Sequence, residues 1–155
     1  LCMGLDNIVV AASNEGILVS KKEQSSYIKP FVDTIDQQIM FAEKSWGYYK
    51  VIDYTSDSIT VKVTLNKNCN MNYHSHEHRD EVWTVVSGEG VAVINEEEIV
   101  LKPGVVVNIP CFCRHTVIAK TKLEIVEIQM GEEITVHDKI KYDFDYKRIV
   151  DKWED

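Results

Sequence analysis

Three histidines, His74, His76 and His78, alternate with other residues shortly before the acidic residue Glu81, and His115 follows downstream. In an extended segment alternate side chains share one face, so these imidazoles would point to the same side. Two of them, the Glu81 carboxylate and a histidine from another strand make a donor set suited to Zn, Mn, Fe, Co or Ni. The sequence therefore predicts a site for one divalent metal ion.

The composition limits the classes of protein that could carry this site. With 155 residues and 45% hydrophobic content, the chain can bury the core of one domain with an appendage. Its 17 basic and 25 acidic residues give a net charge of −8, without a basic run, so we expect no nucleic-acid partner. No apolar run of membrane-spanning length and no signal peptide is present, so we expect a cytoplasmic protein without a membrane partner.

The first 40 residues differ in pattern from the rest and are expected to form an N-terminal arm. Residues 8–12 and 17–19 are apolar and flank a turn sequence, which predicts a β-hairpin. From Lys21 to about Phe41 apolar residues recur every four positions, which predicts a helix, kinked or starting late because Pro30 lies within it. The chain starts at Leu1 instead of Met, which we expect of a trimmed chain or of the tail of a longer polypeptide.

The following residues, 41–155, are expected to form an all-β domain with a short C-terminal extension. Apolar and polar residues alternate from Ile59 to Leu65, as in a half-buried strand. Turn sequences at 67–68, 88–90, 95–96, 103–104 and 120–121 divide the remainder into short Val- and Ile-rich pieces. This pattern predicts a jelly-roll barrel. Residues 143–153 are expected to form a short terminal helix or to pack Phe144, Tyr146 and Trp153 on the barrel.

Two motifs resemble the paired motifs of the cupin superfamily, whose fold is a double-stranded β-helix. The first runs from His74 to Gly88 and the second from Gly104 to His115. Residues 45–53, 78–88 and 126–131 are further similar to the cupin domain of type II phosphomannose isomerases. That domain commonly forms the C-terminal part of mannose-1-phosphate guanylyltransferases, and the arm is similar to the end of their catalytic domain. Because the Gly-rich nucleotide-binding loop is absent, we do not expect this chain to make GDP-mannose by itself.

The cupin resemblance implies His74, His76, Glu81 and His115 as the ligands of one Zn, Mn, Co, Ni or Fe ion. One hairpin would supply the first three and a strand across the barrel the fourth. A pairing of His76 with His78 would leave two residues before Glu81 instead of four, so we prefer His74 and His76.

The isomerase resemblance implies that the site interconverts mannose 6-phosphate and fructose 6-phosphate, with the metal stabilising an enediolate. The reaction needs a base within reach of both C1 and C2. His78 is a candidate by its proximity to the ligands, and Glu127 because strand alternation aims it into the barrel. Arg79, Arg114 and Lys62 are candidates for binding the phosphate through charge-assisted hydrogen bonds.

Two other functions are compatible with this pattern. One is a non-catalytic cupin module that binds a sugar or nucleotide-sugar, or that dimerises a guanylyltransferase. The other is a metal oxygenase, since three histidines and a glutamate around iron are a common dioxygenase set. We expect a homodimer, because an arm and apolar sheet faces would otherwise be exposed. The isomerase family usually has Gln and Gly where this chain has His74 and Phe112. The thiols of Cys111 and Cys113 are expected to be reduced and buried.

Overall fold

The computed structural model describes residues 2–13, 16–34, 39–135 and 137–153. Contacts divide the chain into two compact units, Leu1–Phe41 and Ala42–Asp155. In the first unit β1 (Ile8–Ser13) pairs antiparallel with β2 (Gly16–Lys21), which confirms the two expected strands. The turn residues 14–15 lie outside the described residues.

The long helix expected from Lys21 to about Phe41 is wrong. A 3₁₀ turn, η1 (Ser25–Tyr27), precedes a single turn of α-helix, α1 (Lys29–Val32), and Phe41 already belongs to a strand. Pro30 stands in the first turn of α1, where its missing N–H costs no hydrogen bond, so the helix starts late as expected. Residues 35–38 of the expected helix lie outside the described residues.

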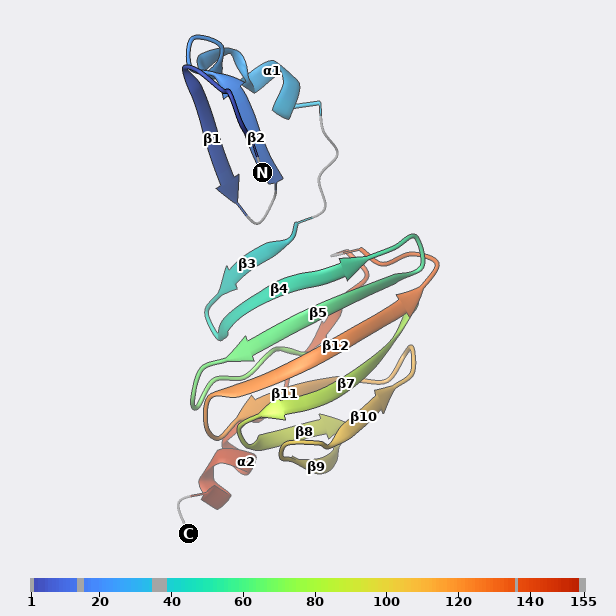
Figure 1. Ribbon diagram of the computed structural model, residues 1–155. Helices are drawn as coiled ribbons and strands as arrows, with labels where there is room; N and C mark the ends of the chain where they lie inside the picture. Colours follow the sequence, from blue (N-terminus) through green and yellow to red (C-terminus); the bar gives the residue numbers. More distant parts are fainter. Residues whose placement is uncertain (1, 14–15, 35–38, 136, 154–155) are drawn as a thin grey trace. The chain divides into compact units, whose positions relative to one another are not determined.

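The second unit is built from two antiparallel sheets (Figure 1), which confirms the expected jelly-roll barrel. The larger sheet has the strand order β10-β7-β12-β5-β4-β3. Its strands are β3 (Phe41–Lys44), β4 (Gly47–Tyr54), β5 (Ser58–Leu65), β7 (Arg79–Ser87), β10 (Val106–Ile109) and β12 (Leu123–Gly131). The smaller sheet has the order β13-β6-β11-β8-β9. Its strands are β6 (Tyr73–Ser75), β8 (Gly90–Ile94), β9 (Glu97–Leu101), β11 (His115–Ala119) and β13 (Ile140–Tyr142).

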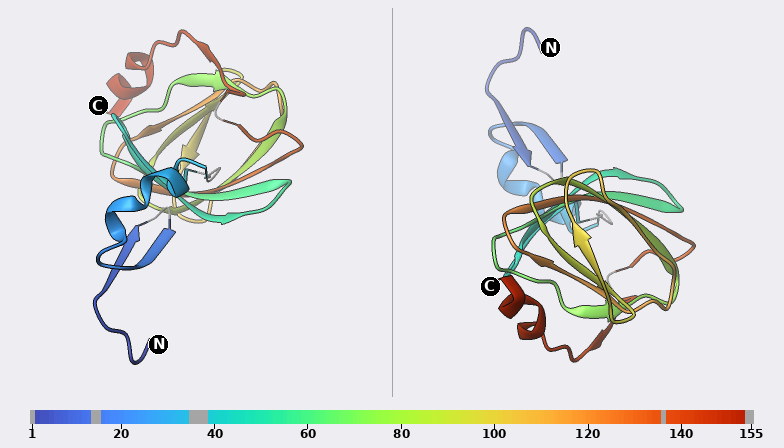
Figure 2. Two further views of the ribbon diagram at one scale, coloured as in Figure 1. Left: turned by 90° about the horizontal axis from the view of Figure 1, so that it is seen from above. Right: turned by 90° about the horizontal axis from the view of Figure 1, so that it is seen from below.

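Apolar side chains from both sheets fill the space between them. On β5, Ile59, Val61 and Val63 are buried while the residues between them are partly exposed, as the alternation predicts. Trp83 of β7 and Val117 of β11 are also almost fully buried. Viewed along the barrel in Figure 2, the sheets curve around this common interior.

The C-terminal segment covers the outer face of the smaller sheet. Tyr73, Val93 and Ile118 on that face form a buried cluster with Ile149 of α2 (Lys147–Val150). Phe144, Tyr146 and Trp153 pack against this cluster, and η2 (Asp151–Trp153) ends the segment. The short terminal helix and the packing of these aromatic residues were both expected. None of the described helices is long and apolar enough to cross a lipid bilayer.

Candidate metal centre

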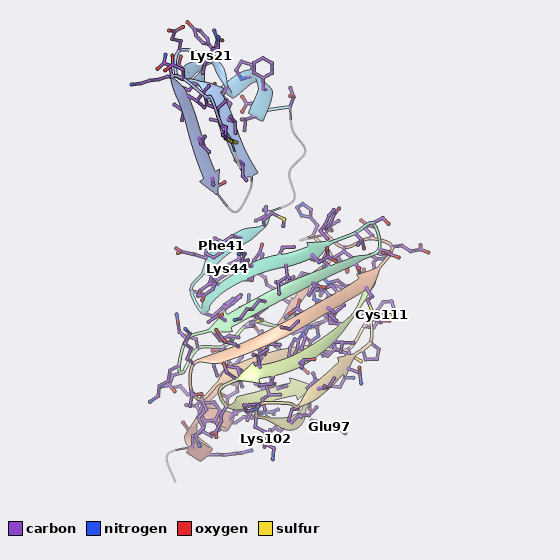
Figure 3. All side chains as sticks on the ribbon, in the orientation of Figure 1. Lys21, Phe41, Lys44, Glu97, Lys102 and Cys111 are labelled. Atoms are coloured by element: carbon purple, nitrogen blue, oxygen red, sulfur yellow. The ribbon has the colours of Figure 1, made fainter. Side chains whose placement is uncertain are left out.

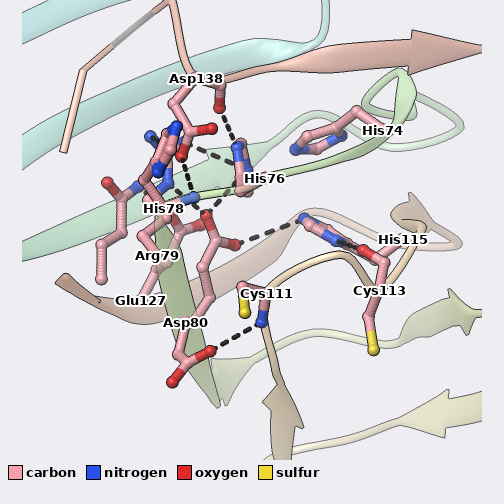
Figure 4. A network of polar contacts seen from close by, with 12 residues as sticks. His74, His76, His78, Arg79, Asp80, Cys111, Cys113, His115, Glu127 and Asp138 are labelled. Atoms are coloured by element: carbon pink, nitrogen blue, oxygen red, sulfur yellow. Dashed lines mark hydrogen bonds and ion pairs between the residues drawn. The ribbon is translucent and has the colours of Figure 1, made fainter. Parts of the chain in front are cut away.

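Three histidines converge at one point, two from strands of the smaller sheet and one from the loop that follows β6. His74 of β6 lies directly opposite His115 of β11 in the strand register, and His76 follows the end of β6. One ring nitrogen of each histidine lies within 4.8 Å of the others (Figure 4). His115 is therefore not across the barrel from His74, as expected, but on the neighbouring strand of the same sheet.

The fourth expected ligand, Glu81, comes from the larger sheet. It lies on β7, with Oε1 3.1 Å from His76 Nε2 and Oε2 3.5 Å from His115 Nε2. The expected hairpin is therefore interrupted: β6 ends at Ser75, and a loop carries the chain to the opposite sheet. All four side chains are at most 4% exposed, so the cluster is a buried junction between the two sheets.

Each histidine of the cluster is oriented by a hydrogen bond from Nδ1 to a backbone carbonyl. His74 Nδ1 donates to Asn72 O at 2.6 Å and His115 Nδ1 donates to Cys113 O at 2.9 Å. His76 Nδ1 donates to the carbonyl oxygen of Asp138. Because each Nδ1 is directed to a carbonyl acceptor, the Nε2 atoms of all three rings are left for the cluster, the usual arrangement of histidines that bind a metal.

These four side chains fit a divalent metal ion. Bonds of about 2.0–2.2 Å to one ion place neighbouring ligand atoms about 2.8–3.6 Å apart, which matches the two distances to Glu81. His115 Nε2 is buried without a hydrogen-bond partner in the described part of the chain. Burial, the charge of His115 and that of Lys139 lower the pKa of His74 to about 2, so this ring stays neutral. The cluster thus combines three imidazoles, with His74 neutral, and one carboxylate.

The Glu81 carboxylate also receives hydrogen bonds from residues beside the cluster. Arg79 Nε donates to Oε1 at 3.2 Å, and Trp83 Nε1 donates to Oε2 at 3.1 Å. Burial alone would raise the pKa of Glu81, but the neighbouring His115 and His76 side chains outweigh it and hold the pKa well below its usual range. Glu81 is therefore an anion, as a ligand must be. Trp83 therefore fixes this carboxylate in addition to packing in the core.

Arg79 is buried within this network. Besides Glu81 it contacts His76 Nε2 at 3.1 Å, and its Nη1 donates to Thr135 O at 2.8 Å. Its guanidinium is thus engaged by the ligands, whereas the sequence assigned it to a substrate phosphate.

Glu127 of β12 is a second buried carboxylate, 7% exposed, and it lies opposite Trp83 in the strand register. Its orientation into the barrel agrees with the alternation expected from the sequence. Burial and the negative charge of Glu81 raise the pKa of Glu127 to about 8, although a hydrogen bond from Gln129 Nε2 opposes the shift. Glu127 can therefore gain and lose a proton near neutral pH.

Three other predicted site residues lie outside the buried cluster. His78 is exposed and borders a hollow beside the cluster. Lys62 is on the outer side of β5, where its Nζ lies 3.3 Å from Glu124 Oε2, so its expected contact with a substrate phosphate at the cluster is corrected. Arg114 is exposed and stacks on the ring of Tyr142, with Cζ 4.1 Å from the ring centre, so its phosphate contact stays a prediction.

Two neighbours in the segment after β12, Asp138 and Lys139, were missed by the sequence reasoning. Asp138 contacts the loop that carries His76. Lys139 is half-buried, and burial lowers the pKa of its ammonium, while the charges of Glu81 and Glu127 oppose this. Across the described residues its ammonium forms no ion pair. Neither residue belongs to a motif, so the sequence carries no local signal that either one lies beside the cluster.

A hollow of about 160 Å³ opens beside the cluster. Lys139, His78, His137 and Thr135 are among its lining residues, together with Glu77, Glu133, Asp138 and Ile140. The lining thus combines two imidazoles and one ammonium with the carboxylates of Glu77, Glu133 and Asp138.

The cysteines take no part in the cluster. Cys111 and Cys113 are free thiols, as expected, but both are partly exposed and not buried. The loop after β10 that carries them lies at the end of the barrel, where Cys111 is labelled in Figure 3. Asn95 Nδ2 donates to Cys113 Sγ at 3.4 Å, which accounts for one of these sulfurs.

Comparisons with known proteins agree with this fold and site. A family model described as "Mannose-6-phosphate isomerase C-terminal" matches residues 32–144. "Alginate biosynthesis protein AlgA" of Pseudomonas putida is 26% identical over 155 residues, covering 94% of this chain and 32% of the relative. "Mannose-1-phosphate guanylyltransferase" of Klebsiella pneumoniae is 24% identical over 155 residues, covering 94% and 33%. The chain thus spans about a third of the length of these curated relatives.

Solved structures show the same fold at low sequence identity. KdgF from Halomonas sp. is 20% identical with a TM-score of 0.53, covering 64% of this chain and 87% of that one. An uncharacterised conserved protein with a double-stranded β-helix domain from Klebsiella pneumoniae is also 20% identical, with a TM-score of 0.55, covering 61% and 83%. These likenesses establish the cupin, or double-stranded β-helix, fold.

Proposed function

Because this chain belongs to the family of mannose-6-phosphate isomerase C-terminal domains, we propose that its metal centre interconverts mannose 6-phosphate and fructose 6-phosphate. The observation that carries this proposal is Glu127, a buried carboxyl group with a pKa near 8 beside a set of metal-binding side chains. A proton carrier next to an electrophile is what a 1,2-isomerisation requires.

The four ligand side chains would hold a Zn, Mn, Co, Ni or Fe ion, which supplies positive charge to the substrate oxygens on C1 and C2. Glu127 takes the proton from C2 of the aldose and returns it to C1, while the hydroxyl proton on O2 passes to O1. His78 is the second candidate for the base, because it borders the hollow.

Lys139 is the best-placed cation for the substrate phosphate. It borders the hollow and lies within electrostatic reach of the buried carboxylates. A phosphate there would form a charge-assisted hydrogen bond with an ammonium that lacks another partner in the described residues. Lys139 thus takes the role that the sequence assigned to Arg114 and Lys62.

An assay of the metal-loaded chain in D₂O tests the proposal. We expect conversion of mannose 6-phosphate to fructose 6-phosphate with solvent deuterium entering the sugar. The variant Glu127→Gln keeps the size of the side chain but cannot carry a proton, so its kcat should fall by about 10²–10⁴-fold. Metal affinity, measured by chelator competition, should stay within a few-fold, because Glu127 is not a ligand.

The matched control is Glu124→Gln on the same strand, whose carboxylate pairs with Lys62 on the outer side of the barrel. Its turnover should equal that of the unmodified chain. If none of the five metals supports turnover, the proposed isomerase activity is rejected. Binding of a sugar phosphate or nucleotide-sugar without turnover would then favour a non-catalytic module, and iron-dependent oxygen uptake would favour an oxygenase.

A further inference from the structure

We propose that Asp138, which lies outside both metal-binding motifs, is the positioning residue of the metal centre. Its backbone carbonyl accepts the Nδ1 proton of the ligand His76. Its carboxylate accepts hydrogen bonds from the backbone N–H groups of the two residues that follow His76. Glu77 N lies 2.8 Å from Oδ1, and His78 N lies 3.2 Å from Oδ2. One residue thus fixes both the ring of a ligand and the backbone that carries it (Figure 4).

The loop from His76 to His78 needs this support, because β6 ends at Ser75 and β7 begins at Arg79. Without a neighbouring strand, the N–H groups of Glu77 and His78 have no ladder partner. Hydrogen bonds from an N–H to an ionised carboxylate are about twice as strong as neutral ones. Because the side chain of Asp138 is only 4% exposed, water competes poorly for these bonds.

The neighbourhood of Asp138 holds this residue in a fixed position. Arg79 Nη1 lies 4.0 Å from Asp138 Oδ2, and the same Nη1 donates to Thr135 O. Directly after Asp138, β13 pairs with β6, with Ile140 opposite Ser75. Thr135, Asp138 and Ile140 are therefore each attached to the segment from Ser75 to Arg79 that contains His76. It follows that the segment after β12 orients a proposed metal ligand, His76, in addition to pairing with β6 through β13.

The proposal rests on the metal centre described above and not on isomerase turnover, so its test measures metal binding. In Asp138→Ala both carboxylate oxygens that accept from the backbone N–H groups of Glu77 and His78 are lost. In Asp138→Asn one oxygen remains, and the amide NH₂ faces an N–H donor. We expect Co²⁺ affinity, from competition with a chelator, to fall tenfold or more in Asp138→Ala and less in Asp138→Asn. The visible absorption of bound Co²⁺ should change as well, because the His76 ring is less well oriented.

The matched control is Asp143→Asn, an equal change of charge at an exposed position of the same segment. Its Co²⁺ affinity should stay within twofold of the unmodified chain. Co²⁺ affinity is measured at a temperature at which circular dichroism shows the metal-free variants to be folded. If Asp138 only stabilises the fold, its replacement would then leave the Co²⁺ affinity unchanged. Should Asp138→Ala fail to fold, Asp138→Asn alone decides.

Three results would overturn the proposal: unchanged Co²⁺ affinity and spectrum in the folded Asp138 variants, an equal loss in Asp143→Asn, or no metal binding by the unmodified chain. Absence of sugar-phosphate turnover combined with weakened Co²⁺ binding in the Asp138 variants would reject the isomerase and support the role of Asp138.

Discussion

Two buried carboxyl groups on neighbouring strands, Glu81 and Glu127, have pKa values shifted in opposite directions. Burial disfavours the charge of both. The charge of Glu81 is compensated by the neighbouring His115 and His76 side chains, whereas Glu127 faces the charge of Glu81 and receives a hydrogen bond from the neutral amide of Gln129. Such divergence separates the roles of two acids in one site, here the proposed metal ligand and the proposed proton carrier.

This raised pKa predicts how the stability of the metal-free protein depends on pH. The folded chain holds the Glu127 proton up to about pH 8, whereas an unfolded chain releases it near the ordinary value of 4.5. Folded protein therefore binds more protons between these values, and this residue makes the free energy of unfolding fall as pH rises through that window. Glu127→Gln removes this contribution, so the variant should gain stability relative to the unmodified chain at pH 8.5 but not at pH 4.

Urea unfolding at both pH values, with EDTA present, measures this difference. The control is Glu132→Gln, an exposed residue in the described segment after β12. An equal effect of Glu127→Gln at pH 4 and pH 8.5 would contradict the raised pKa.

Lys139 gives a second prediction at the scale of single residues. Replacing it with Met keeps the length of the side chain and removes the charge that we assign to the substrate phosphate. We expect KM for mannose 6-phosphate to rise by about tenfold or more, since a hydrogen bond to a charged group contributes about 1.5–3 kcal/mol. Steady-state kinetics measure this change. Lys141→Met, in the exposed neighbouring position, should leave KM unchanged, and an equal rise there would point to overall charge instead.

At the scale of elements, strand register decides which side chains meet. His74 and His115 are adjacent because β6 and β11 pair at that position, and Glu81 reaches them because β7 lies in the facing sheet. Gly131 at the end of β12 lies against the loop that joins β6 to β7: a Cβ on Gly131 would be 2.1 Å from His78 O. The close approach of the two backbones thus requires glycine at this position.

The C-terminal element gives a stability prediction. Ile149 is 1% exposed and packs with Tyr73 and Ile118 on the outer face of the sheet that carries two ligands. Truncation to Ala should lower the free energy of unfolding by about 2–5 kcal/mol, the usual cost of such a cavity. Urea unfolding measures the loss. Lys152→Ala, which removes an exposed ion pair with Glu98, should cost at most about 1 kcal/mol. A loss no larger for Ile149→Ala than for Lys152→Ala would mean that the segment does not stabilise the sheet.

At the scale of the whole molecule, the second unit contains the complete set of candidate ligands, and the first unit contributes none of the described ones. The activities and partners of the longer relatives are not thereby transferred to this chain, which covers about a third of them. The homodimer and the role of residues 1–40 as the end of a guanylyltransferase domain stay predictions. Sedimentation velocity of the full chain decides the first.

Metal binding should stabilise the whole fold, because the ligands join the two sheets. A metal at 100 times its Kd adds about 2.7 kcal/mol to the free energy of unfolding when only the folded state binds it. We therefore expect Tm to rise on adding Co²⁺ or Zn²⁺ and to return with EDTA, as measured by calorimetry. His115→Ala should abolish most of this rise, whereas His137→Ala, an exposed imidazole outside the cluster, should retain it. A similar rise in both variants would place metal binding elsewhere.

The sequence by itself determined the strand-rich fold and the identity of the clustered histidines. Alternation along residues 59–65 and regularly spaced turns specify short antiparallel strands, because side chains on a strand alternate between two faces. The spacing of His74, His76, Glu81 and His115 identified the residues that converge. The helix over Lys21–Phe41 was wrong because a four-residue period does not guarantee a buried face: Tyr27 is 66% and Phe31 is 71% exposed.

Only the tertiary structure decided which charged groups face the cluster. Lys62 and Arg114 lie outside it, whereas Asp138 and Lys139 lie beside it, because a charge on a strand or loop carries no local signal of the face it will occupy. Tertiary structure also decided that the proton of each ligand imidazole lies on Nδ1, since the carbonyl acceptor of His76 comes from a residue 62 positions away. The physical reason is that charge placement, desolvation and tautomer depend on contacts between distant segments, whereas strand periodicity is local.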